Sequence, residues 1–349
     1  MSKIRVLHVT NKLELGGTEK TLQIFCQYLD KSRFEVLVCG RLGGGVRADE
    51  LRRAGIPVII QPPDLTELIR EQKIDICHVH RAGAYEPGTL PQQINGRTRV
   101  VETNVFHMYD ERESDRIDCH CFVSESSKRI YLGRHGERPG VRYEVLYNPV
   151  DFSEFDPAPK HFSSTIGRCS RPDDQKWHDV CVNSLPRIFR NVPATRCLIQ
   201  GATDRVKAKL QALGVESRVQ LLEPSVQVGD FYRRLDIFTH GARIGETFGC
   251  VIAEAMANRI PVVTLSTPQR KKANAQAELV EHNVTGFVCR WQWQYAGAVI
   301  ELLRNEELRA TFGRRSYEKA REHFEAGAIT RRLAQIYCDL MDMPSQHHL

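Results

Sequence analysis

The chain lacks long apolar runs, and the mean hydropathy of its 349 residues is −0.39. No stretch approaches about 18 uninterrupted apolar residues, so no membrane-spanning helix is expected. The opening residues, MSKIRVLHVTNKLE, are interrupted at once by charged and polar side chains, which argues against a secretory signal. A cytoplasmic location is therefore expected. Peripheral attachment to the inner face of a membrane is compatible with that location.

The chain also lacks a charge excess of one sign. It holds 49 Lys and Arg against 43 Asp and Glu, a net charge of +6. This balance gives no electrostatic reason to expect a nucleic acid partner. A slightly basic protein is compatible with anionic small molecules, and these are the partners we expect.

Cysteine is present without a pattern. The 11 cysteines are odd in number and have no spacing typical of a secreted disulfide framework. Cys119 and Cys121 flank His120, but two sulfurs so close on one strand, with no second Cys or His pair nearby, make a poor zinc site. We expect unpaired cysteines in a reducing compartment, and no bound metal.

What the sequence does have is alternation between short apolar runs and longer amphipathic segments. IRVLHVT (4–10) is followed by TEKTLQIFCQYL (18–29), and the rhythm restarts at STIGRCS (164–170) after a proline-bearing linker. Strands separated by helices of this length predict parallel sheets covered on both faces. The fold class expected is α/β, with two Rossmann-like doubly wound domains facing a cleft that holds the ligand.

Two glycines, Gly16 and Gly17, lie between the first strand and the first helix in LGGTEK. Glycine allows close backbone approach there, and the amides at the start of the helix could face an anion. The loop lacks the G-x-G-x-x-G pattern of dinucleotide-binding folds, so an NAD site is not expected. A plain turn is the alternative.

Arg171 and Lys176 follow the first strand of the second domain, in SRPDDQKW. An arginine fork and a lysine point charge at a strand end suit a diphosphate. The alternative is a solvated charged loop.

The most informative stretch is GETFGCVIAEAMANRIPVV, in which two glutamates interrupt a helix–strand pattern. Glu246 precedes the expected helix and Glu254 lies inside it. Carboxylates accept paired hydroxyl hydrogens of the kind that sugars present. The amides at the helix start suit a phosphate; they belong to Phe248, Gly249, Cys250 and Val251. The alternative is a capping glutamate and a structural ion pair.

This stretch resembles the signature of the retaining GT-B glycosyltransferases of family four, the glycogen-synthase-like group. Its two glutamates are followed by the E-A-M-A-x-x-x-P-V-V run of that family. Other segments are similar to family motifs in the same order: LGGTEK, DICHVH, VLYNPVDFSEF, SRPDDQKW and NAQAELVEHNVTGFV. Together they span most of the chain.

The resemblance implies roles for these residues. Glu246 would contact the hydroxyls of the donor sugar, and Glu254 would hold the ribose. Arg171 and Lys176 would neutralise the diphosphate with the amides at the helix start, and the glycine pair would let the first loop close over the phosphates. The resemblance also implies that no cofactor or metal is needed, and the chain has no D-x-D pair of the metal-dependent fold.

The acceptor side departs from the family pattern. Asn104 stands roughly where many members have an active-site histidine, and His107 follows three residues later. His107 could substitute for that histidine, or Asn104 could bind a hydroxyl; a plain surface or core histidine is equally compatible. His80 is a further acceptor-side candidate, because it ends a strand expected at the cleft.

The expected domains are residues 1–152 on the acceptor side, 153–328 on the nucleotide-sugar side, and a C-terminal helix, 329–349, packing back on the first domain. The expected function is retaining transfer from a nucleotide-diphosphate sugar, with UDP favoured over GDP, to a glycan, lipid-linked or small-molecule hydroxyl. Polysaccharide or glycoconjugate synthesis is the setting. The alternatives are a non-catalytic nucleotide-sugar-binding relative and a nucleotide-sugar epimerase on the same fold.

A membrane contact is a further hypothesis. SKRIYLGRHGERPGVR gathers several Lys and Arg around an apolar pair, Tyr131 and Leu132, that is expected to be exposed. Such a patch could rest on anionic lipid. A solvated helix and loop is the alternative.

Overall fold

The structure is a computed structural model that describes residues 3–92, 98–155, 162–225, 228–267 and 273–343. The chain divides into two compact units: unit 1 is Met1–Pro149 with Ala326–Leu349, and unit 2 is Val150–Glu325. The sequence placed these divisions three residues later, at 152/153 and 328/329. Residues 156–161 of the expected linker and 344–349 of the expected C-terminal helix lie outside the described residues.

Unit 1 is built on a parallel sheet with the strand order β3-β2-β1-β4-β5-β6-β7. The strands are β1 (Ile4–Lys12), β2 (Phe34–Gly43), β3 (Val58–Ile60), β4 (Ile76–Arg81), β5 (Arg99–Asn104), β6 (Cys119–Phe122) and β7 (Arg142–Val145). Every residue of β4 and of β5 is buried, as expected for central strands of a sheet with helices on both faces.

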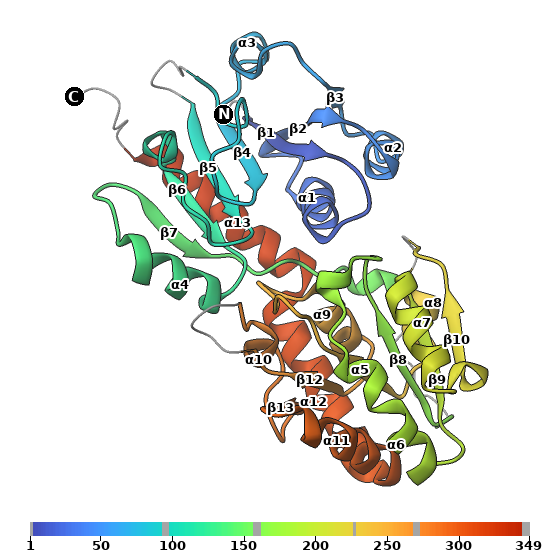
Figure 1. Ribbon diagram of the computed structural model, residues 1–349. Coiled ribbons are helices and arrows are strands. Elements are labelled where there is room, and N and C mark those ends of the chain that lie inside the picture. Colours follow the sequence, from blue (N-terminus) through green and yellow to red (C-terminus); the bar gives the residue numbers. More distant parts are fainter. Residues whose placement is uncertain (1–2, 93–97, 156–161, 226–227, 268–272, 344–349) are drawn as a thin grey trace. The chain divides into compact units, whose positions relative to one another are not determined.

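The helices of unit 1 are α1 (Gly17–Tyr28), α2 (Val46–Arg53), α3 (Leu65–Glu71), η1 (Ser114–Arg116), α4 (Glu125–His135) and α13 (Ala326–Asp342). The last helix, α13, is drawn in red in Figure 1 and packs on the sheet of unit 1. Its apolar stripe, which includes Leu333 and Tyr337, meets Phe25 of α1 and Val6 of β1. The C-terminal helix therefore completes the core of unit 1, as the resemblance implied.

Unit 2 repeats the plan with a parallel sheet in the order β10-β9-β8-β11-β12-β13. Its strands are β8 (Thr165–Cys169), β9 (Arg196–Gln200), β10 (Val219–Leu222), β11 (Ile237–His240), β12 (Val262–Leu265) and β13 (Gly286–Cys289). Its helices are η2 (Phe152–Glu154), η3 (Asp174–Lys176), α5 (Val180–Asn183), α6 (Leu185–Asn191), α7 (Asp204–Ala212), η4 (Glu216–Arg218), α8 (Gly229–Arg233), α9 (Cys250–Ala257), α10 (Gln276–Leu279), α11 (Gln292–Arg304) and α12 (Glu306–Phe324).

Both sheets are doubly wound, which confirms the fold class predicted from the sequence. In each unit the chain reverses its direction of travel across the sheet between two central strands, β1 and β4 in unit 1 and β8 and β11 in unit 2. Ligands of such sheets bind beyond the carboxyl ends of the strands that flank this reversal. A ligand site in unit 2 is therefore expected at the loops that follow β8 and β11.

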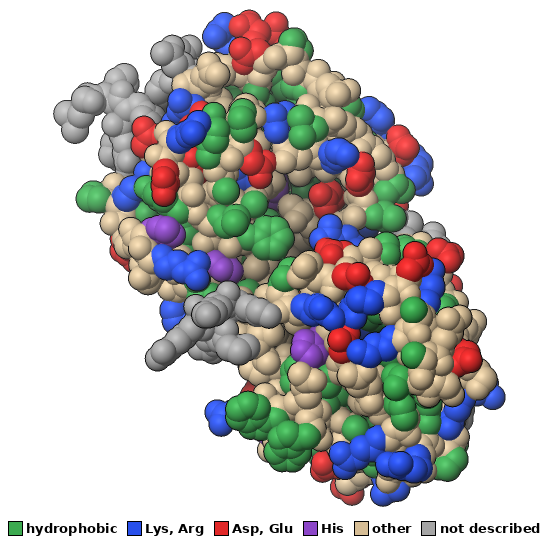
Figure 2. All heavy atoms as spheres, viewed as in Figure 1, with side chains coloured by type: hydrophobic (Ala, Val, Ile, Leu, Met, Phe, Trp, Pro, Cys, Tyr) green, Lys and Arg blue, Asp and Glu red, His purple; other side chains and the backbone are tan. Residues whose placement is uncertain are grey.

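The surface carries charges of both signs. Basic and acidic side chains are interspersed over most of the face in Figure 2, in keeping with the small net charge of the sequence. Among the helices described, none combines the length and apolar character needed to cross a bilayer.

Candidate active site

The loops after β8 and β11 bring Lys176 and Glu246 together. Lys176 ends the short helix η3, and Asp173 caps that helix by accepting a hydrogen bond from the amide of Gln175. Its Nζ lies 2.7 Å from Oε2 of Glu246, and Glu246 is only 6% exposed. Two residues that the sequence assigned to one donor site thus form a close ion pair.

The Glu246 carboxylate is held in its ionised form. Burial alone would raise its pKa, but the charge of Lys176 and a hydrogen bond from His240 outweigh burial and lower the pKa well below the usual range. A carboxylate that stays charged can only accept hydrogen bonds, so it suits a hydroxyl-bearing ligand.

The backbone around Glu246 is fixed from two sides. Its amide donates to the Gln276 side chain at 3.1 Å, and its carbonyl accepts from the amide of Ala275 at 2.9 Å. Gly245 has a φ of +75°, and a Cβ there would lie 1.9 Å from the carbonyl oxygen of Ala273. Only glycine fits this approach, so the loop presents Glu246 in one position.

Arg168 and His240 also contribute to this site, and the sequence analysis did not identify either. Arg168 is buried in β8 and donates from one nitrogen to the backbone carbonyls of Lys176 at 2.6 Å and Gly241 at 3.4 Å. Its guanidinium lies 5.1 Å from the ring centre of Trp177. Among the described residues no carboxylate forms an ion pair with Arg168, so its positive charge stays at this edge of the sheet.

His240 is the last residue of β11 and is fully buried. Its Nδ1 lies 2.9 Å from Oγ1 of Thr264, and its Nε2 lies 3.3 Å from Oε1 of Glu246. Burial, together with the nearby charge of Arg168, lowers the pKa of His240 to about 4. A histidine closing an apolar strand just ahead of the glutamate signature was the signal available in the sequence.

Arg171 differs from Lys176, because its side chain is exposed and no described residue pairs with it. It follows β8 directly, and Trp177 donates to its backbone carbonyl at 3.3 Å. The expected arginine and lysine therefore share one loop, with Lys176 fixed and Arg171 open to solvent.

The second glutamate, Glu254, lies within α9 and is 6% exposed. The hydroxyl of Tyr232, from α8, donates to its Oε2 at 2.9 Å. Tyr232 has no counterpart in the motifs and could not be identified from spacing. Its contact shows that Glu254 is a buried carboxylate with a polar partner from another element, not a solvated helix charge.

The start of α9 lies where the sequence placed it. Gly249 is the N-cap with a φ of +101°, and Cys250 and Val251 are the first two residues of the helix. Phe248 is buried against Phe324, with ring centres 5.3 Å apart. This contact anchors the turn that leads into the helix.

A cavity of about 460 Å³ lies at the carboxyl ends of β8, β9 and β10. Its lining includes Pro172, Gly201, Thr203, Arg205, Leu222 and Glu223. A larger cavity of about 780 Å³ opens near Thr165, Arg196 and Val219, at the amino ends of the same strands. Parallel α/β sheets bind ligands at the carboxyl ends, so we assign the smaller cavity to the site.

In unit 1, Gly16 is the N-cap of α1 and Gly17 is its first residue. Gly16 has an extended backbone that any residue adopts, but a Cβ there would lie 2.0 Å from Oε2 of Glu19. The Glu19 carboxylate is the far end of a flexible side chain that can move aside, so this contact does not require glycine. A role of the pair in contacting phosphates remains a proposal.

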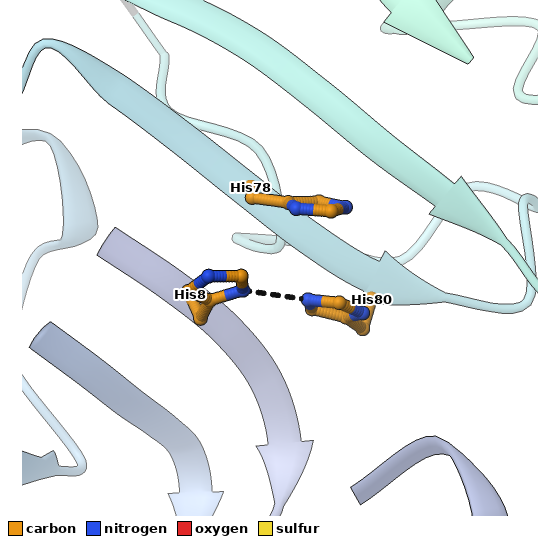
Figure 3. Close-up of side chains that lie close together, drawn as sticks. All are labelled: His8, His78 and His80. Atoms are coloured by element: carbon orange, nitrogen blue, oxygen red, sulfur yellow. Dashed lines mark hydrogen bonds between the residues drawn. The ribbon is translucent and has the colours of Figure 1, made fainter. Parts of the chain in front are cut away.

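His80 belongs to a cluster of three buried imidazoles shown in Figure 3, in which a hydrogen bond joins the edges of His8 and His80. Its Nε2 lies 2.9 Å from Nδ1 of His8, and its ring centre lies 4.2 Å from that of His78. The two ring nitrogens of His78 meet Tyr337 and Thr103 hydroxyls at 2.6 and 2.8 Å. Both nitrogens of His78 are thus taken up by hydroxyls, whereas Nδ1 of His80 is buried with no hydrogen-bond partner among the described residues. The strand expected to end at His80 runs one residue further, so His80 lies inside β4.

Asn104 ends β5 and is fully buried. Its amide group donates to Glu102 at 3.2 Å and to the backbone carbonyl of Met108 at 2.8 Å. Gly83, with a φ of +99°, lies directly against this side chain. Asn104 thus ties together the loops that follow β4 and β5, which is a structural role.

His107 lies in the loop that Asn104 holds, with a φ of +47°. Burial and the charge of Arg134 lower its pKa to about 4, so the ring is neutral at pH 7. Its buried Nδ1 has no hydrogen-bond partner among the described residues. Of the acceptor-side candidates, His107 is the one with an unsatisfied nitrogen outside the strands.

The Cys119–His120–Cys121 segment forms β6 and is buried. His120 directs Nδ1 at Glu102, 2.6 Å away, and the two sulfurs lie 3.9 Å apart. The hydrogen bond between the thiols and their burial raise the pKa of Cys119. His120 pairs with Glu102 and the two thiols pair with each other on one buried strand, which fits the expectation of a structural segment.

The expected exposed pair on α4 is wrong for Tyr131, which is 1% exposed. Its ring packs against Phe122 and His120, with ring centres 5.0 and 5.3 Å away. The helix turns this residue toward the sheet, and Leu132 is half-buried. The basic residues of α4 alone do not distinguish a lipid surface from solvent.

Comparison with known proteins relates this chain to glycosyltransferases. Residues 158–319 match the family model of glycosyl transferases group 1. Among curated relatives, N-acetyl-alpha-D-glucosaminyl L-malate synthase of Bacillus anthracis is 22% identical over 79% of this chain and 78% of its own. The human alpha-1,3/1,6-mannosyltransferase ALG2 is 29% identical over 92% of this chain and 77% of its own.

Among solved structures, HepE of Anabaena in complex with UDP and glucose superposes with a TM-score of 0.77 at 18% identity, over 96% of this chain and all of its own. A glycosyltransferase of Rickettsia africae gives a TM-score of 0.78 at 18% identity, over 99% of this chain and all of its own. At such identities the likeness establishes the fold. Residues 158–319, in unit 2, therefore resemble the glycosyl transferases group 1 family, and the chain has the GT-B fold.

Proposed function

We propose that the protein transfers a sugar from a nucleotide-diphosphate sugar, with UDP as the favoured nucleotide, to a hydroxyl group of an acceptor, with retention at the anomeric carbon. The observation that carries this proposal is the buried, ionised Glu246 held by Lys176 beyond the carboxyl ends of β8 and β11. The Glu246 carboxylate can accept hydrogen bonds from sugar hydroxyls, and the adjacent Lys176 ammonium can pair with a diphosphate.

The diphosphate would lie against Lys176 and Arg171. In this arrangement the two cations offset the negative charge that grows on the leaving diphosphate. The amides at the start of α9 stabilise the same negative charge. Such preorganised donors act most strongly where water is excluded. No divalent metal is required by this arrangement, since the protein itself supplies the positive charge.

The two glutamates would divide the hydroxyls of the donor. Glu246 would hold those of the sugar, and Glu254, with Tyr232 beside it, those of the ribose. The nucleotide base would lie in the cavity beside Pro172 and Glu223. The complex of HepE with UDP and glucose supports UDP as the first nucleotide to test.

In the transfer step, the bond between the anomeric carbon and the diphosphate oxygen breaks, and its electron pair leaves with the diphosphate. The acceptor oxygen forms the new bond on the same face, and its proton passes to the leaving phosphate oxygen. No separate protein base is needed, which is compatible with Asn104 standing roughly where many family members have a histidine.

The acceptor is proposed only as a hydroxyl-bearing molecule. The named relatives include a glucosaminyl L-malate synthase and a phosphatidyl-myo-inositol mannosyltransferase, whose names imply chemically different acceptors. Synthesis of a polysaccharide or another glycoconjugate is the setting we propose.

The experiment is a thermal-shift and nucleotide-release screen over UDP-, GDP- and ADP-sugars with the full chain, followed by NMR analysis of the product anomer. We expect a UDP-sugar to stabilise the protein and release UDP when an acceptor is added. Glu246→Gln, which keeps the shape and removes the charge, should abolish transfer. A wild-type protein that binds no nucleotide sugar, or a Glu246→Gln variant with undiminished transfer, overturns the proposal.

A further inference from the structure

The Glu246 carboxylate has two side-chain partners in the described structure, and they divide its oxygens. Lys176 takes Oε2 at 2.7 Å, and His240 takes Oε1 at 3.3 Å. The lysine arrives on a long flexible stem from the loop after β8, and its side chain is 17% exposed. The histidine arrives from the end of β11, and its side chain is fully buried.

The contacts of His240 define which nitrogen carries its proton. An ionised carboxylate can only accept a hydrogen bond, so Nε2 must be the nitrogen that donates to Glu246. Nδ1 is then the unprotonated nitrogen and accepts from the hydroxyl of Thr264, 2.9 Å away. The Glu246 carboxylate thus sets the tautomer of His240, and Thr264, on β12, holds the ring through Nδ1.

His240 is also held more rigidly than Lys176. Its backbone pairs with that of Thr264 in the sheet, and its carbonyl accepts from the buried hydroxyl of Tyr295 at 3.0 Å. A ring packed in this way keeps its direction when neighbouring groups move. Within the described part of the chain, the lysine ammonium has no comparable restraint beyond its ion pair.

This difference matters when a donor binds. The Lys176 ammonium that pairs with Glu246 is also the charge proposed to meet the diphosphate, so a bound donor offers it a second anion. If the ammonium turns toward the diphosphate, Glu246 loses its closest partner at the moment when it must face the sugar. The His240 N–H remains to restrain the carboxylate.

We propose that His240 is a positioning residue that keeps the Glu246 carboxylate aligned with the donor sugar while Lys176 engages the diphosphate. The inference rests on the proposed function, because it needs a donor with a diphosphate and a sugar. The competing interpretation is that His240 is an ordinary core histidine whose contact with Glu246 adds nothing to catalysis.

The kinetic test compares His240→Leu, which removes the N–H in a similar volume, with His240→Gln, whose amide N–H can approach the place of Nε2. Because a hydrogen bond to a charged group is worth roughly a 10- to 100-fold change, His240→Leu should lower kcat by about that factor. UDP affinity should change by less than about twofold, because UDP does not contact Glu246 in this arrangement. His240→Gln should recover most of kcat, and the matched control His323→Gln, on the exposed face of α12, should behave as wild type.

A wild-type kcat in His240→Leu overturns the inference, and so does a loss of kcat in His240→Gln as large as in His240→Leu. If His240→Leu does not fold, Thr264→Val provides a second test, since it preserves the shape and removes the hydroxyl that holds the His240 ring through Nδ1. A lower kcat with unchanged UDP affinity in Thr264→Val supports the inference, and an unchanged kcat overturns it.

A measurement without turnover separates this inference from the proposed function. Long-range proton–nitrogen NMR of the wild-type chain should show His240 with its proton on Nε2, and Glu246→Gln should shift that resonance. A proton on Nδ1 overturns the inference even if the protein is an active transferase. Absence of nucleotide-sugar binding in the wild type, with the Nε2 proton in place, overturns the proposed function and leaves the His240–Glu246 contact established.

Discussion

Nζ of Lys176 and Oε2 of Glu246 lie 2.7 Å apart, although 70 positions separate the two residues in the chain. The ion pair joins the loop after β8 to the loop after β11, so the two halves of the doubly wound sheet of unit 2 meet at one charged contact.

Lys176→Met should abolish the pairing and leave Glu246 buried beside a neutral side chain. Without the lysine charge the pKa of Glu246 rises, because burial, which opposes ionisation, is no longer outweighed. We expect kcat/KM for the donor to fall by about 100-fold or more, since a charge-assisted contact made in the transition state is lost. Steady-state kinetics check this, and a variant within threefold of wild type would contradict the proposed site. Lys31→Met, which changes an exposed lysine between α1 and β2, is the matched control.

Tyr232→Phe should weaken nucleotide binding and lower stability. The variant removes the hydroxyl that donates to Glu254 at 2.9 Å, and the buried carboxylate then loses one of its partners. Losing a hydrogen bond to a buried charged group costs about 1–3 kcal/mol. Urea denaturation measures the stability and calorimetry with UDP the affinity. Tyr317→Phe, on a half-buried tyrosine of α12, should change neither, and an unaltered Tyr232→Phe protein would refute the role given to this contact.

Gly245→Ala should disturb Glu246 through the backbone. A Cβ at this position meets the Ala273 carbonyl oxygen at 1.9 Å, and the φ of +75° is unfavourable for alanine. We expect a loss of stability of at least about 1 kcal/mol and a larger loss of transfer activity. Gly297→Ala is the control: it lies within α11 with open space around its Cβ, and should stabilise the helix by roughly 0.5–1 kcal/mol.

Stability should fall as the pH is lowered from 6.5 toward 4. Burial lowers the pKa of His8 to about 3 and that of His240 to about 4, against an ordinary value of 6.5. Between these pKa values the histidine is protonated in the unfolded chain and neutral in the folded chain. Each such histidine therefore lowers the free energy of unfolding by about 1.4 kcal/mol for each unit that the pH falls. The stability is fully present above pH 6.5 and is lost on acidification. Urea denaturation at pH 7, 6 and 5 measures the slope, His240→Gln should reduce it, and a flat profile would contradict the neutral, buried state of these rings.

Chelation should leave transfer unaffected. The proposed site supplies its positive charge from Lys176 and Arg171, so EDTA in excess over any divalent ion should not change kcat by more than about twofold if no metal bridges the diphosphate. The assay is donor turnover with and without EDTA, followed by Mg²⁺ or Mn²⁺ addition. A loss on chelation that Mg²⁺ restores would require a metal in the mechanism.

The sequence determined the alternation of strands and helices, because apolar periodicity follows from which faces of each element must leave water. It also determined the turn from Gly245 to Val251 and the placing of Glu254 inside the helix that follows, since these depend on residues close together in the chain. The motif order then assigned a family and, with it, candidate roles for Glu246, Lys176 and Arg171.

The tertiary structure decided which side chains meet. Arg168, Tyr232 and His240 act on the site through partners on other elements, and no local pattern reports such contacts. For Tyr131 the local pattern was misleading, because whether a residue of a mixed helix is buried depends on the sheet it packs against. The structural role of Asn104 likewise depends on its contact with the loop at Gly83. Long-range packing, and not spacing in the chain, brings these two residues together.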